Sequence, residues 1–498
     1  MSESYHIYQP KWLGSYVHAK HLLRRFVLVV LFFFPISSSM ATEVNANSCP
    51  VQANHQLIAA WYGWWGRPET SGEWVHWQKV NEKNHMIANT QDYPENGPYD
   101  SHDPVILSHQ IELGKSSGVT AFAASWWGQK DFSDTSLRDL LIVAERACFR
   151  VAAYYETIRP MPGQTPVDTV TGDILYLLEH YTDSPAWLRW RNQPVIFIYS
   201  RAVNKISKEN WNEVVAKIEA KHPGGAALIA DVSESYRQRL QHNSLRPAKV
   251  FRGVHVYNIT KEIQGMTPGA IAAWGRTDYT QIVASTLPGD PSITTIIPGY
   301  NDSKASTSKL ARPITERFNG ETYKALWGAA IEANPDWLLL TSWNEWHEGT
   351  QIEPSYEYGA LYTDLTKQYS KIFLSQPPSS RGNALIRSLY SCVLERAPNN
   401  EELAHDLSNL SVSFRSPFRK VFRSSEYVGK LASNEQYIGQ LYRCIFLRSP
   451  DVSGLTGYLA ALSHGKSRDA ILEDFLNSAE FKHRWVIASD VETRSRAR

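Results

Sequence analysis

Residues 337–354 read WLLLTSWNEWHEGTQIEP, and this stretch changes character halfway along. Leu338, Leu339 and Leu340 form a short continuous apolar run, which predicts a buried strand. The run then enters a segment that alternates indole rings with ionisable groups, including Glu345 and Glu348. Two carboxylates three residues apart, beside rings that lower the local dielectric, suit acid/base chemistry on a sugar. The alternative is a solvated loop with ordinary surface charges, but indole side chains are not expected to alternate with charged ones in such a loop.

Seven other runs resemble the one that begins at Trp337. They are near-continuous apolar segments, as expected of parallel strands covered on both faces, at 57–65, 119–127, 151–157, 194–200, 226–232, 253–258 and 294–300. Helical patterns lie between several of them, at 106–117, 136–147 and 211–221, and Asp103-Pro104 is a plausible start for the first. This alternation predicts an α/β fold of the (β/α)8 TIM-barrel type. A doubly wound open sheet is the alternative, although no glycine-rich dinucleotide loop follows the first strand.

Polar and aromatic residues gather where the predicted strands end. Active sites of (β/α)8 barrels lie at these carboxyl ends, and indole rings stack well on sugars. For any single aromatic, packing at the rim is an equally good explanation, but the coincidence on one rim predicts a polysaccharide cleft. The residues concerned are Tyr62, Trp64, Trp65, Trp126, Trp127, Tyr155, Glu156, Tyr199, Asp231, Tyr257, Tyr300, Asn344, Glu345 and Glu348.

Several motifs in this part of the chain carry a family resemblance. In order, they are WWGRPE (64–69), WVHW (74–77), YPENGPY (93–99) with DP (103–104), SWWG (125–128), PGY (298–300), RFNG (317–320) and NEWHEGT (344–350). Together they are similar to the motifs of glycoside hydrolase family 99, which contains endo-α-1,2-mannosidases and endomannanases. The resemblance covers about 55 to 375, and the last motif is the most specific. We therefore predict a hydrolase domain at 55–376.

The resemblance implies separate roles for the two glutamates. The family cleaves α-mannosidic bonds inside a chain with net retention, and its mechanism is thought to use the substrate's own 2-hydroxyl as nucleophile, through a 1,2-anhydro sugar. Glu345 would be the base on that hydroxyl, and Glu348 the acid on the departing oxygen and later the base on water. This differs from the usual carboxylate nucleophile of retaining enzymes. It requires Glu348 protonated and Glu345 ionised. The family needs no metal and no organic cofactor.

The resemblance also implies substrate-binding residues. These are Tyr62, Trp126, Trp127, Glu156, Tyr257, Asn344 and His347. The segment 154–158 reads YYETI where the family usually reads HIEPY, so Glu156 is kept while its neighbours differ. Since this segment shapes the donor-side subsites, the resemblance does not fix the sugar preferred there. The expected partner is a mannose-containing oligosaccharide or polysaccharide. The formal net charge of +1 gives no indication of nucleic acid.

The C-terminal part of the chain contains an internal repeat. After a predicted linker at 377–383, LYSCVLERAP (389–398) recurs as LYRCIFLRSP (441–450), and FRSSEY (422–427) recurs as LNSAEF (476–481). The period of about 52 residues predicts a small all-α domain of two repeats at 384–486, before a polar tail at 487–498. The second unit resembles the bacterial domain of unknown function 4214, which implies a surface-attachment or glycan-proximity role. Asp451 is expected to cap a helix, with a metal site as the alternative.

The N-terminus has the pattern of a secretory signal. Lys20, Arg24 and Arg25 precede an apolar run at 26–36 and a small-residue segment, which predicts a signal peptide at 1–41 and a short leader at 42–54. The run is short for a membrane span, which needs about 20 residues. An uncleaved anchor and a start codon assigned too early are the alternatives. We expect an exported bacterial enzyme that is periplasmic, attached to the cell surface or secreted, without stable membrane insertion after cleavage.

Four cysteines fit no zinc or redox spacing. The obvious pairs for an exported protein are Cys49 with Cys148 and Cys392 with Cys444, while separate buried thiols remain equally compatible with the sequence. Two other functions also fit parts of the pattern. One is a non-catalytic carbohydrate-binding surface protein, which would have lost a carboxylate at 345 or 348. The other is a relative that serves polysaccharide biosynthesis, which export disfavours because nucleotide-sugar donors are cytoplasmic.

Overall fold

Eight parallel strands form a barrel that is nearly closed. The computed structural model describes residues 54–232, 250–286, 289–306, 312–430 and 433–482, with Cys49, Gln52 and Trp485. In the sheet the strands follow the order β7-β6-β5-β3-β2-β1-β9-β8, and the short β4 (Arg189–Trp190) pairs antiparallel with β5. The first strand lies between β2 and β9, so the beginning and end of the barrel sequence meet. This arrangement confirms the (β/α)8 prediction over an open doubly wound sheet.

Every predicted apolar run overlaps one of these strands. Their bounds are β1 Gln56–Trp61, β2 Ala121–Trp126, β3 Arg150–Tyr155, β5 Gln193–Ile198, β6 Ala227–Asp231, β7 Phe251–His255, β8 Ile293–Ile296 and β9 Trp337–Leu340. Each strand ends one to four residues before its apolar run. After β9, the backbone N–H of Ser342 turns to the carbonyl of Thr350 at 2.9 Å, so the chain leaves the sheet and folds back on itself. This turn carries Glu345 and Glu348.

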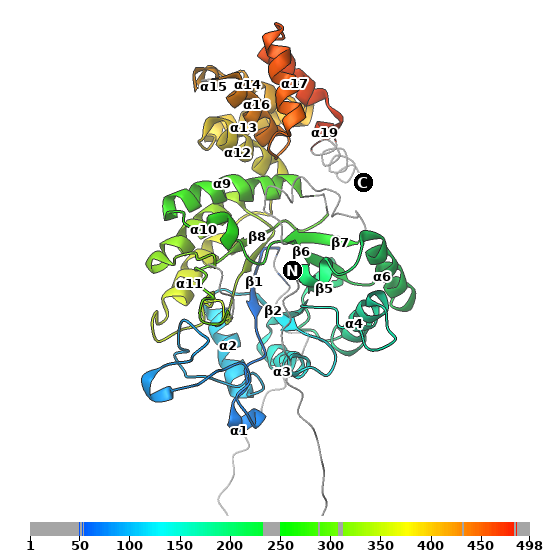
Figure 1. Ribbon diagram of the computed structural model, residues 1–498, viewed down its shortest axis with the longest axis vertical. Helices are drawn as coiled ribbons and strands as arrows, with labels where there is room; N and C mark the ends of the chain where they lie inside the picture. The colour runs from blue at the N-terminus through cyan, green and yellow to red at the C-terminus, as the bar shows by residue number, and fades with distance from the viewer. Residues whose placement is uncertain are drawn as a thin grey trace, which may run out of the picture. The chain divides into compact units, whose positions relative to one another are not determined.

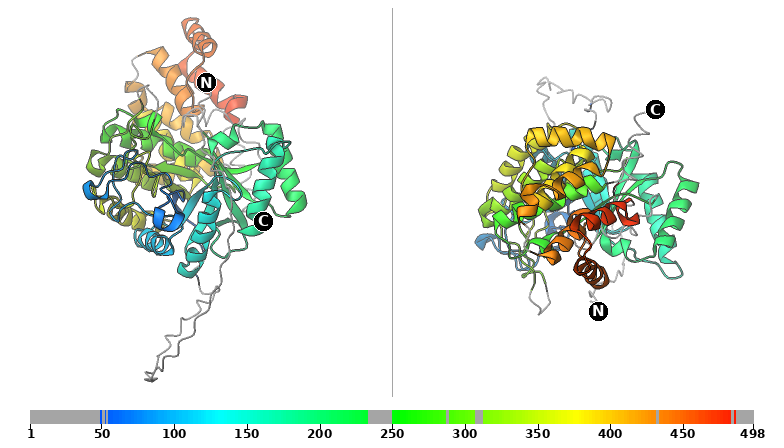
Figure 2. Two further views of the ribbon diagram at one scale, coloured as in Figure 1. Left: turned by 60° about the horizontal axis from the view of Figure 1, so that its bottom comes forward. Right: turned by 90° about the horizontal axis from the view of Figure 1, so that it is seen from above.

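Helices cover the outside of the barrel (Figures 1 and 2). The predicted helix starts are late in two cases, because α3 and α6, capped by Asp131 and Ser207, begin four and three residues before the predicted positions. Asp103 caps α2 as predicted, accepting the backbone N–H of Val105 at 2.8 Å. The longer helices are α2 Pro104–Ser116, α3 Phe132–Ala147, α4 Pro166–His180, α6 Lys208–Lys221, α9 Pro268–Ser285, α10 Glu321–Ala333 and α11 Leu361–Leu374. The short ones are α1 Pro68–Ser71, α5 Ser200–Val203 and α8 Thr260–Ile263.

Side chains alternate between two apolar layers along each strand. Residues such as Leu57, Phe122 and Leu338 pack outward beneath the helices. The barrel interior is filled by a separate cluster of inward side chains, including Ile58, Ala60, Ala121, Ala123, Ala152, Tyr154, Phe197, Ile229, Trp337 and Leu339. This period of two fixes which residues at the strand ends face the barrel mouth.

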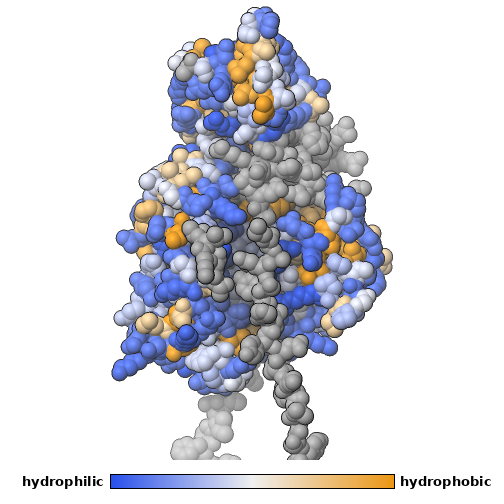
Figure 3. All heavy atoms as spheres, in the orientation of Figure 1, coloured by the Kyte–Doolittle hydropathy of each residue, from blue (hydrophilic) through white to orange (hydrophobic). Residues whose placement is uncertain are grey.

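The C-terminal helices repeat the same contacts in each half. They are α12 Arg381–Leu394, α13 Asn400–Val412, α14 Ser416–Phe422, α15 Ser425–Lys430, α16 Asn434–Ile445, α17 Val452–Ser463, α18 Arg468–Asn477 and α19 Ala479–Phe481. Arg396 pairs with Glu426 at 2.8 Å in the first half, as Arg448 pairs with Glu480 at 2.9 Å in the second. Asp451 caps α17 by accepting the N–H of Gly454 at 2.7 Å, as predicted. Figure 3 shows apolar surface among these helices, where Val452 is 85% exposed.

The predicted linker is partly helical. Residues 381–383 belong to α12. The guanidinium of Arg381 donates to the carbonyls of Thr286 and Asp290, at 2.8 and 2.9 Å, so this end of the linker is held against the residues that follow α9. The predicted signal peptide lies outside the described residues, as does most of the leader. Within the described ranges, no helix is long and apolar enough to cross a bilayer.

Both obvious cysteine pairs form disulfides, with Cα atoms 5.3 Å apart for Cys49–Cys148 and 5.7 Å apart for Cys392–Cys444. The second bridge joins α12 to α16 at equivalent positions of the two repeats.

We expect Cys392→Ser/Cys444→Ser to lower the free energy of unfolding of the helical region by about 3 kcal/mol, because a long loop is no longer closed in the unfolded chain. Hydrogen exchange should accelerate in α12 and α16 and stay unchanged in the barrel strands. Unchanged exchange in both helices would contradict this expectation.

Candidate functional site

Glu345 and Glu348 lie on the tight loop after β9. The hydroxyl of Ser342 holds this loop, because it accepts the backbone N–H of Glu345 at 2.8 Å and lies 2.8 Å from the hydroxyl of Thr350. The N–H of Trp343 donates to the carbonyl of Ala60 at 2.7 Å, which ties the loop to β1. After β9 the chain therefore leaves the sheet and forms a loop that these hydrogen bonds hold at the mouth of the barrel.

Asn344 fastens the same loop. Its Oδ1 accepts the N–H of Tyr62 at 2.6 Å, and its Nδ2 donates to the carbonyl of Tyr62 at 2.9 Å and to the hydroxyl of Tyr99 at 3.0 Å. Because the side chain is fully buried and both amide hydrogens are used within the protein, Asn344 positions the loop in this structure, and its predicted contact with substrate stays a prediction.

A buried glutamate that the sequence analysis did not single out supports this arrangement. Glu353 accepts the hydroxyl of Tyr99 at 2.7 Å and the amide of Gln110 at 2.6 Å. Tyr99 in turn accepts the indole N–H of Trp346 at 3.1 Å. Burial raises the pKa of Glu353 to about 7, with the Tyr99 and Gln110 hydrogen bonds acting in the opposite direction. In the sequence, Tyr99 lies in the YPENGPY motif and Glu353 lies in the IEP segment that ends residues 337–354, and these two motifs are the signals that could have pointed to the pair.

We expect Tyr99→Phe to reduce both stability and rate. The substitution leaves the carboxyl of Glu353 and the donors of Asn344 and Trp346 without their shared partner, which costs about 1–3 kcal/mol of unfolding free energy. Loosening the loop should also lower kcat about 10-fold. Chemical denaturation and steady-state kinetics measure the two effects. Tyr356→Phe is the matched control, since Tyr356 is 66% exposed. Equal behaviour of the two variants would contradict the proposed role of Tyr99.

Burial dominates the electrostatics of the two loop glutamates. It raises the pKa of Glu348 to about 8, assisted by the charge of Asp302 and opposed by a hydrogen bond from Tyr257. Burial also raises the pKa of Glu345, with the negative charge of Glu348 adding to the rise. Hydrogen bonds from backbone N–H groups favour the ionised form of Glu345. One of them comes from the N–H of His347, which donates to Oε1 of Glu345 at 3.0 Å. The negative charge of one carboxyl favours the protonated form of the other, so their titrations are linked.

Two tyrosines connect this pair to the opposite side of the mouth. The hydroxyl of Tyr62, after β1, donates to that of Tyr257, after β7, at 2.7 Å. Burial raises the pKa of Tyr62, and the charges of Glu156, Glu345 and Glu348 add to the rise. Burial followed by the charge of Glu348 does the same for Tyr257. Both hydroxyls therefore stay protonated among the carboxyls and act as donors.

Glu156 provides a third buried carboxyl at the mouth. It follows β3, is 3% exposed, and accepts the hydroxyl of Ser125 at 2.8 Å. The same Ser125 oxygen accepts the indole N–H of Trp127 at 3.0 Å. Burial raises the pKa of Glu156 to about 7, while the Ser125 hydrogen bond and the charge of Arg201 lower it. The structure thus brings Tyr62, Trp127, Glu156 and Tyr257 together with Glu345 and Glu348.

Comparison with known proteins accounts for this arrangement. The model of glycosyl hydrolase family 99 matches residues 52–366. The chain belongs to this family. The domain of unknown function DUF4214 matches residues 419–485, in agreement with the repeat seen in the sequence.

Curated relatives and solved structures agree with this assignment. The chain is 23% identical over 375 residues to a mouse glycoprotein endo-alpha-1,2-mannosidase, covering 67% of this chain and 76% of the relative. It is 26% identical to a human glycoprotein endo-alpha-1,2-mannosidase-like protein, covering 64% and 76%. The GH99 endo-alpha-mannosidase structure from Bacteroides thetaiotaomicron, complexed with BIS-TRIS-propane, superimposes with a TM-score of 0.53 at 26% identity. That match covers 64% of this chain and 97% of the bacterial one. The barrel is an endo-α-mannosidase-like glycoside hydrolase domain.

One predicted subsite residue of the family 99 domain faces away from the mouth. Trp126 is fully buried outside the barrel, with its ring against Tyr155 and Tyr176 and its indole N–H on Asp134 at 2.9 Å. Residues alternate along β2, so Ser125 and Trp127 face the mouth whereas Trp126 faces the helices. Trp126 therefore packs beneath the helices in this structure, and its predicted contact with substrate stays a prediction.

His347 lies beside Glu345 within the family 99 site. Its Nδ1 is 3.7 Å from Oε1 of Glu345, and its Nε2 is 2.8 Å from the amide of Asn89. Burial lowers the pKa of His347 to about 4, so the ring is neutral near pH 7. Trp64, which was placed on the rim but not among the binding residues, lies in the same aromatic group: its ring stacks on His76 at 4.6 Å and lies 5.8 Å from that of Trp127. The predicted contact of His347 with substrate stays a prediction.

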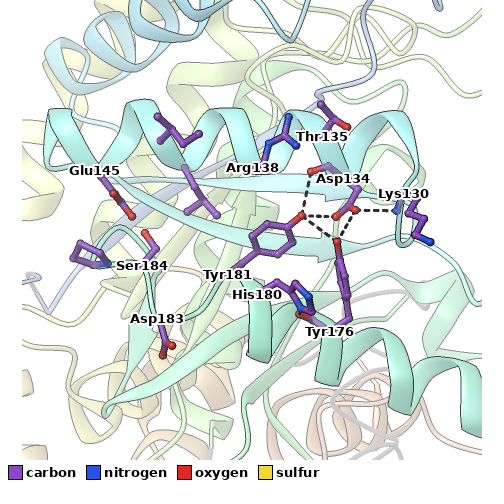
Figure 4. A pocket seen from close by; sticks show the side chains of 13 residues that line it. Lys130, Asp134, Thr135, Arg138, Glu145, Tyr176, His180, Tyr181, Asp183 and Ser184 are labelled. Atoms are coloured by element: carbon purple, nitrogen blue, oxygen red, sulfur yellow. Dashed lines mark hydrogen bonds between the residues drawn. The ribbon is translucent and has the colours of Figure 1, made fainter.

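A separate pocket lies on the outer wall of the family 99 barrel, between α3 and α4 (Figure 4). Asp134 is its central acceptor, receiving the hydroxyls of Tyr176 and Tyr181 at 2.9 and 2.8 Å. None of its lining residues belongs to the predicted catalytic or binding set. Because Asp134 also receives the indole of Trp126, this pocket helps to fix the strand end that carries Trp127.

Proposed function

We propose that this enzyme cleaves α-mannosidic bonds within a glycan and retains the anomeric configuration. The observation that supports this most strongly is the pair of glutamates on one loop held by hydrogen bonds, with Glu345 buried and Glu348 partly buried, among hydroxyl and indole groups at the barrel mouth. A non-catalytic, purely sugar-binding barrel would have lost one of the two carboxylates, whereas both Glu345 and Glu348 are present in this chain.

Glu348 acts as the general acid in this proposal. Its raised pKa keeps it protonated at neutral pH, and its Oε2 is buried without a hydrogen-bond partner in the described part of the chain, so it is available to a leaving oxygen. The hydrogen bond from Tyr257 helps to orient the carboxyl.

Glu345 acts as the base. Its N–H donors favour the carboxylate and oppose the rise in pKa that burial and the charge of Glu348 cause, and on this basis we assign the ionised form to Glu345 and the proton to Glu348. Glu345 removes the proton of the mannose 2-hydroxyl, the 2-oxygen attacks C1, and Glu348 protonates the departing oxygen. Water then opens the resulting 1,2-anhydro sugar, with Glu348 as base and Glu345 returning the proton to the 2-oxygen. The 2-oxygen inverts C1 when it displaces the leaving group, and water inverts C1 again when it opens the anhydro ring, so the product has the configuration of the substrate.

The pH dependence of kcat follows from these protonation states. Because the pKa of Glu348 is raised to about 8, the required acid form is present below this pH and is lost above it. We expect kcat to decline on the alkaline side of about pH 8, and Glu348→Gln to abolish that limb. Initial rates in overlapping buffers provide the measurement. A rate that is flat to pH 10 in the wild-type enzyme would contradict the assignment.

Product analysis tests the proposed function. A small panel of α-mannans and glucosylated mannose oligosaccharides, incubated with the enzyme, should release oligosaccharides that mass spectrometry identifies by length and linkage. We expect internal cleavage at α-1,2 linkages. Release of mannose alone, or of no product from any α-mannoside, would overturn the proposal.

We also propose that the enzyme works outside the cytoplasm. All four cysteines are paired in the two disulfides, and such bridges persist in oxidising compartments. Cell fractionation followed by non-reducing peptide mapping should find the bridged protein in the periplasm, at the surface or in the medium. Accumulation of the reduced protein in the cytoplasm would contradict this.

A further inference from the structure

Two arginines lie over the ring of Trp127 at the barrel mouth. The guanidinium carbon of Arg159 is 4.9 Å from the ring centre, and that of Arg201 is 5.0 Å from it. They come from different parts of the barrel, since Arg159 lies in the loop after β3 and Arg201 lies on α5, after β5. Stacking on an indole limits the rotamers of a long side chain, so both cations are held in place before a ligand arrives.

Trp127 itself is fixed next to the buried carboxyl of the donor side. Its indole N–H donates to Ser125 at 3.0 Å, and Ser125 donates to Glu156 at 2.8 Å. Its backbone N–H donates to the hydroxyl of Ser133 at 2.9 Å. The two guanidiniums are therefore positioned relative to Glu156, at the rim of the site, and not on an unrelated surface.

The charge of this arginine pair is poorly compensated. Arg159 has one acidic contact, Asp131 at 3.4 Å, with half of the arginine side chain exposed. Arg201 forms no ion pair of 4.0 Å or less within the described ranges. Two carboxyl groups at the mouth have other hydrogen-bond partners: Asp231 accepts the backbone N–H groups of Ser200 and Tyr257, at 3.2 and 2.8 Å, and Glu156 accepts the hydroxyl of Ser125 at 2.8 Å. The charge of Arg201 nevertheless lowers the pKa of Glu156. Glu345 and Glu348 face the same mouth from the loop after β9.

A neutral mannoside offers only hydroxyl groups, and these do not require two guanidiniums of which one has a single long ion pair and the other has none within the described ranges. The planar fork of arginine matches the paired oxygens of a carboxylate, phosphate or sulfate. We propose that the donor-side subsite beside Trp127 accepts a mannose residue that carries an oxyanionic substituent, clamped between Arg159 and Arg201. This deepens the proposed function, on which it rests, by naming the substrate class. Arg159 directly follows the segment 154–158, where the chain departs from the usual family sequence.

Binding to an inactivated enzyme tests the proposal. Glu348→Gln enzyme is titrated calorimetrically with three α-mannotetraoses of identical linkage, of which one is neutral, one carries a phosphate monoester on a donor-side mannose, and one carries a carboxylate at the same position. We expect at least one charged ligand to bind about 10-fold more tightly than the neutral one, with an advantage that shrinks in high salt. The two charged ligands distinguish phosphate from carboxylate recognition.

Variants in the same background assign the effect to the clamp. Arg201→Gln and Arg159→Gln should reduce the charged-to-neutral affinity ratio to about 1, whereas Arg201→Lys should keep part of it. Arg138→Gln is the matched control, because Arg138 is an exposed arginine that pairs with Asp139 on α3. A neutral ligand that binds as well as both charged ones, an advantage that survives Arg201→Gln, or no binding of any ligand would overturn the proposal. Wild-type cleavage of the neutral ligand separately shows whether the proposed function holds.

Discussion

Glu348→Gln is expected to lower kcat on an α-mannan by about 10³-fold, because glutamine has the shape of the protonated acid but cannot transfer its proton. If Glu348 is the general acid, the loss of kcat in this variant should depend on whether the leaving group needs a proton. A mannobiosyl fluoride needs no proton to depart, so its first step should be much less affected than that of the mannan. Azide, which needs no general base, should restore turnover of this donor. Equal losses on both donors, without rescue by azide, would contradict the acid/base role.

Stability measurements separate this chemical effect from misfolding. The pKa of Glu348 is raised from its model-compound value of 4.5 to about 8 in the folded chain. The folded state therefore binds more protons than the unfolded state between these values, and this group makes stability fall as pH rises through that window. Since glutamine has no charge to bury, the melting temperature at pH 8 should not be lower than that of the wild type. Glu209→Gln, at an exposed position of α6, is the matched control for kcat.

Glu345→Gln is expected to cause a loss of similar size, about 10³-fold in kcat, but with a different signature. The 2-hydroxyl must lose its proton whatever the leaving group is, so the mannan and the fluoride should be affected alike. Azide should not restore turnover, because the missing step precedes formation of the 1,2-anhydro sugar. The amide oxygen of the variant can still accept the N–H of His347, which favours an intact loop. Retention of normal activity on the fluoride would exclude Glu345 as the base.

The strands can be predicted from the sequence because parallel strands buried on both faces read as apolar runs. The same runs do not reveal which of two neighbouring residues faces the barrel interior. Trp126 and Trp127 show this, since only the alternation of β2 in the folded sheet separates a packing indole from one at the mouth. The early helix starts are visible in principle, because Asp131 and Ser207 are good N-caps that the apolar pattern alone does not detect.

The roles of polar residues depend on partners far away in the chain. Asn344 has the chemistry of a sugar ligand, yet its amide is occupied by Tyr62 and Tyr99, which are 282 and 245 positions away. Glu353 supports the loop through Gln110, 243 positions away, and the IEP segment in which it lies does not by itself reveal that partner. By contrast, Glu345 and Glu348 could be singled out early because indoles beside carboxylates are costly without a function. Their separate roles came from the family resemblance and not from spacing.

The stereochemistry of the first product tests the central claim most directly. Proton NMR, recorded during cleavage of an α-1,2-linked mannan and before mutarotation, follows the anomeric signal of the new reducing end. We expect oligosaccharides whose new reducing end appears first as the α-anomer, because the 2-oxygen and then water each invert C1 once. Initial appearance of the β-anomer would show a single displacement, and would contradict a reaction in which Glu345 activates the substrate's own hydroxyl.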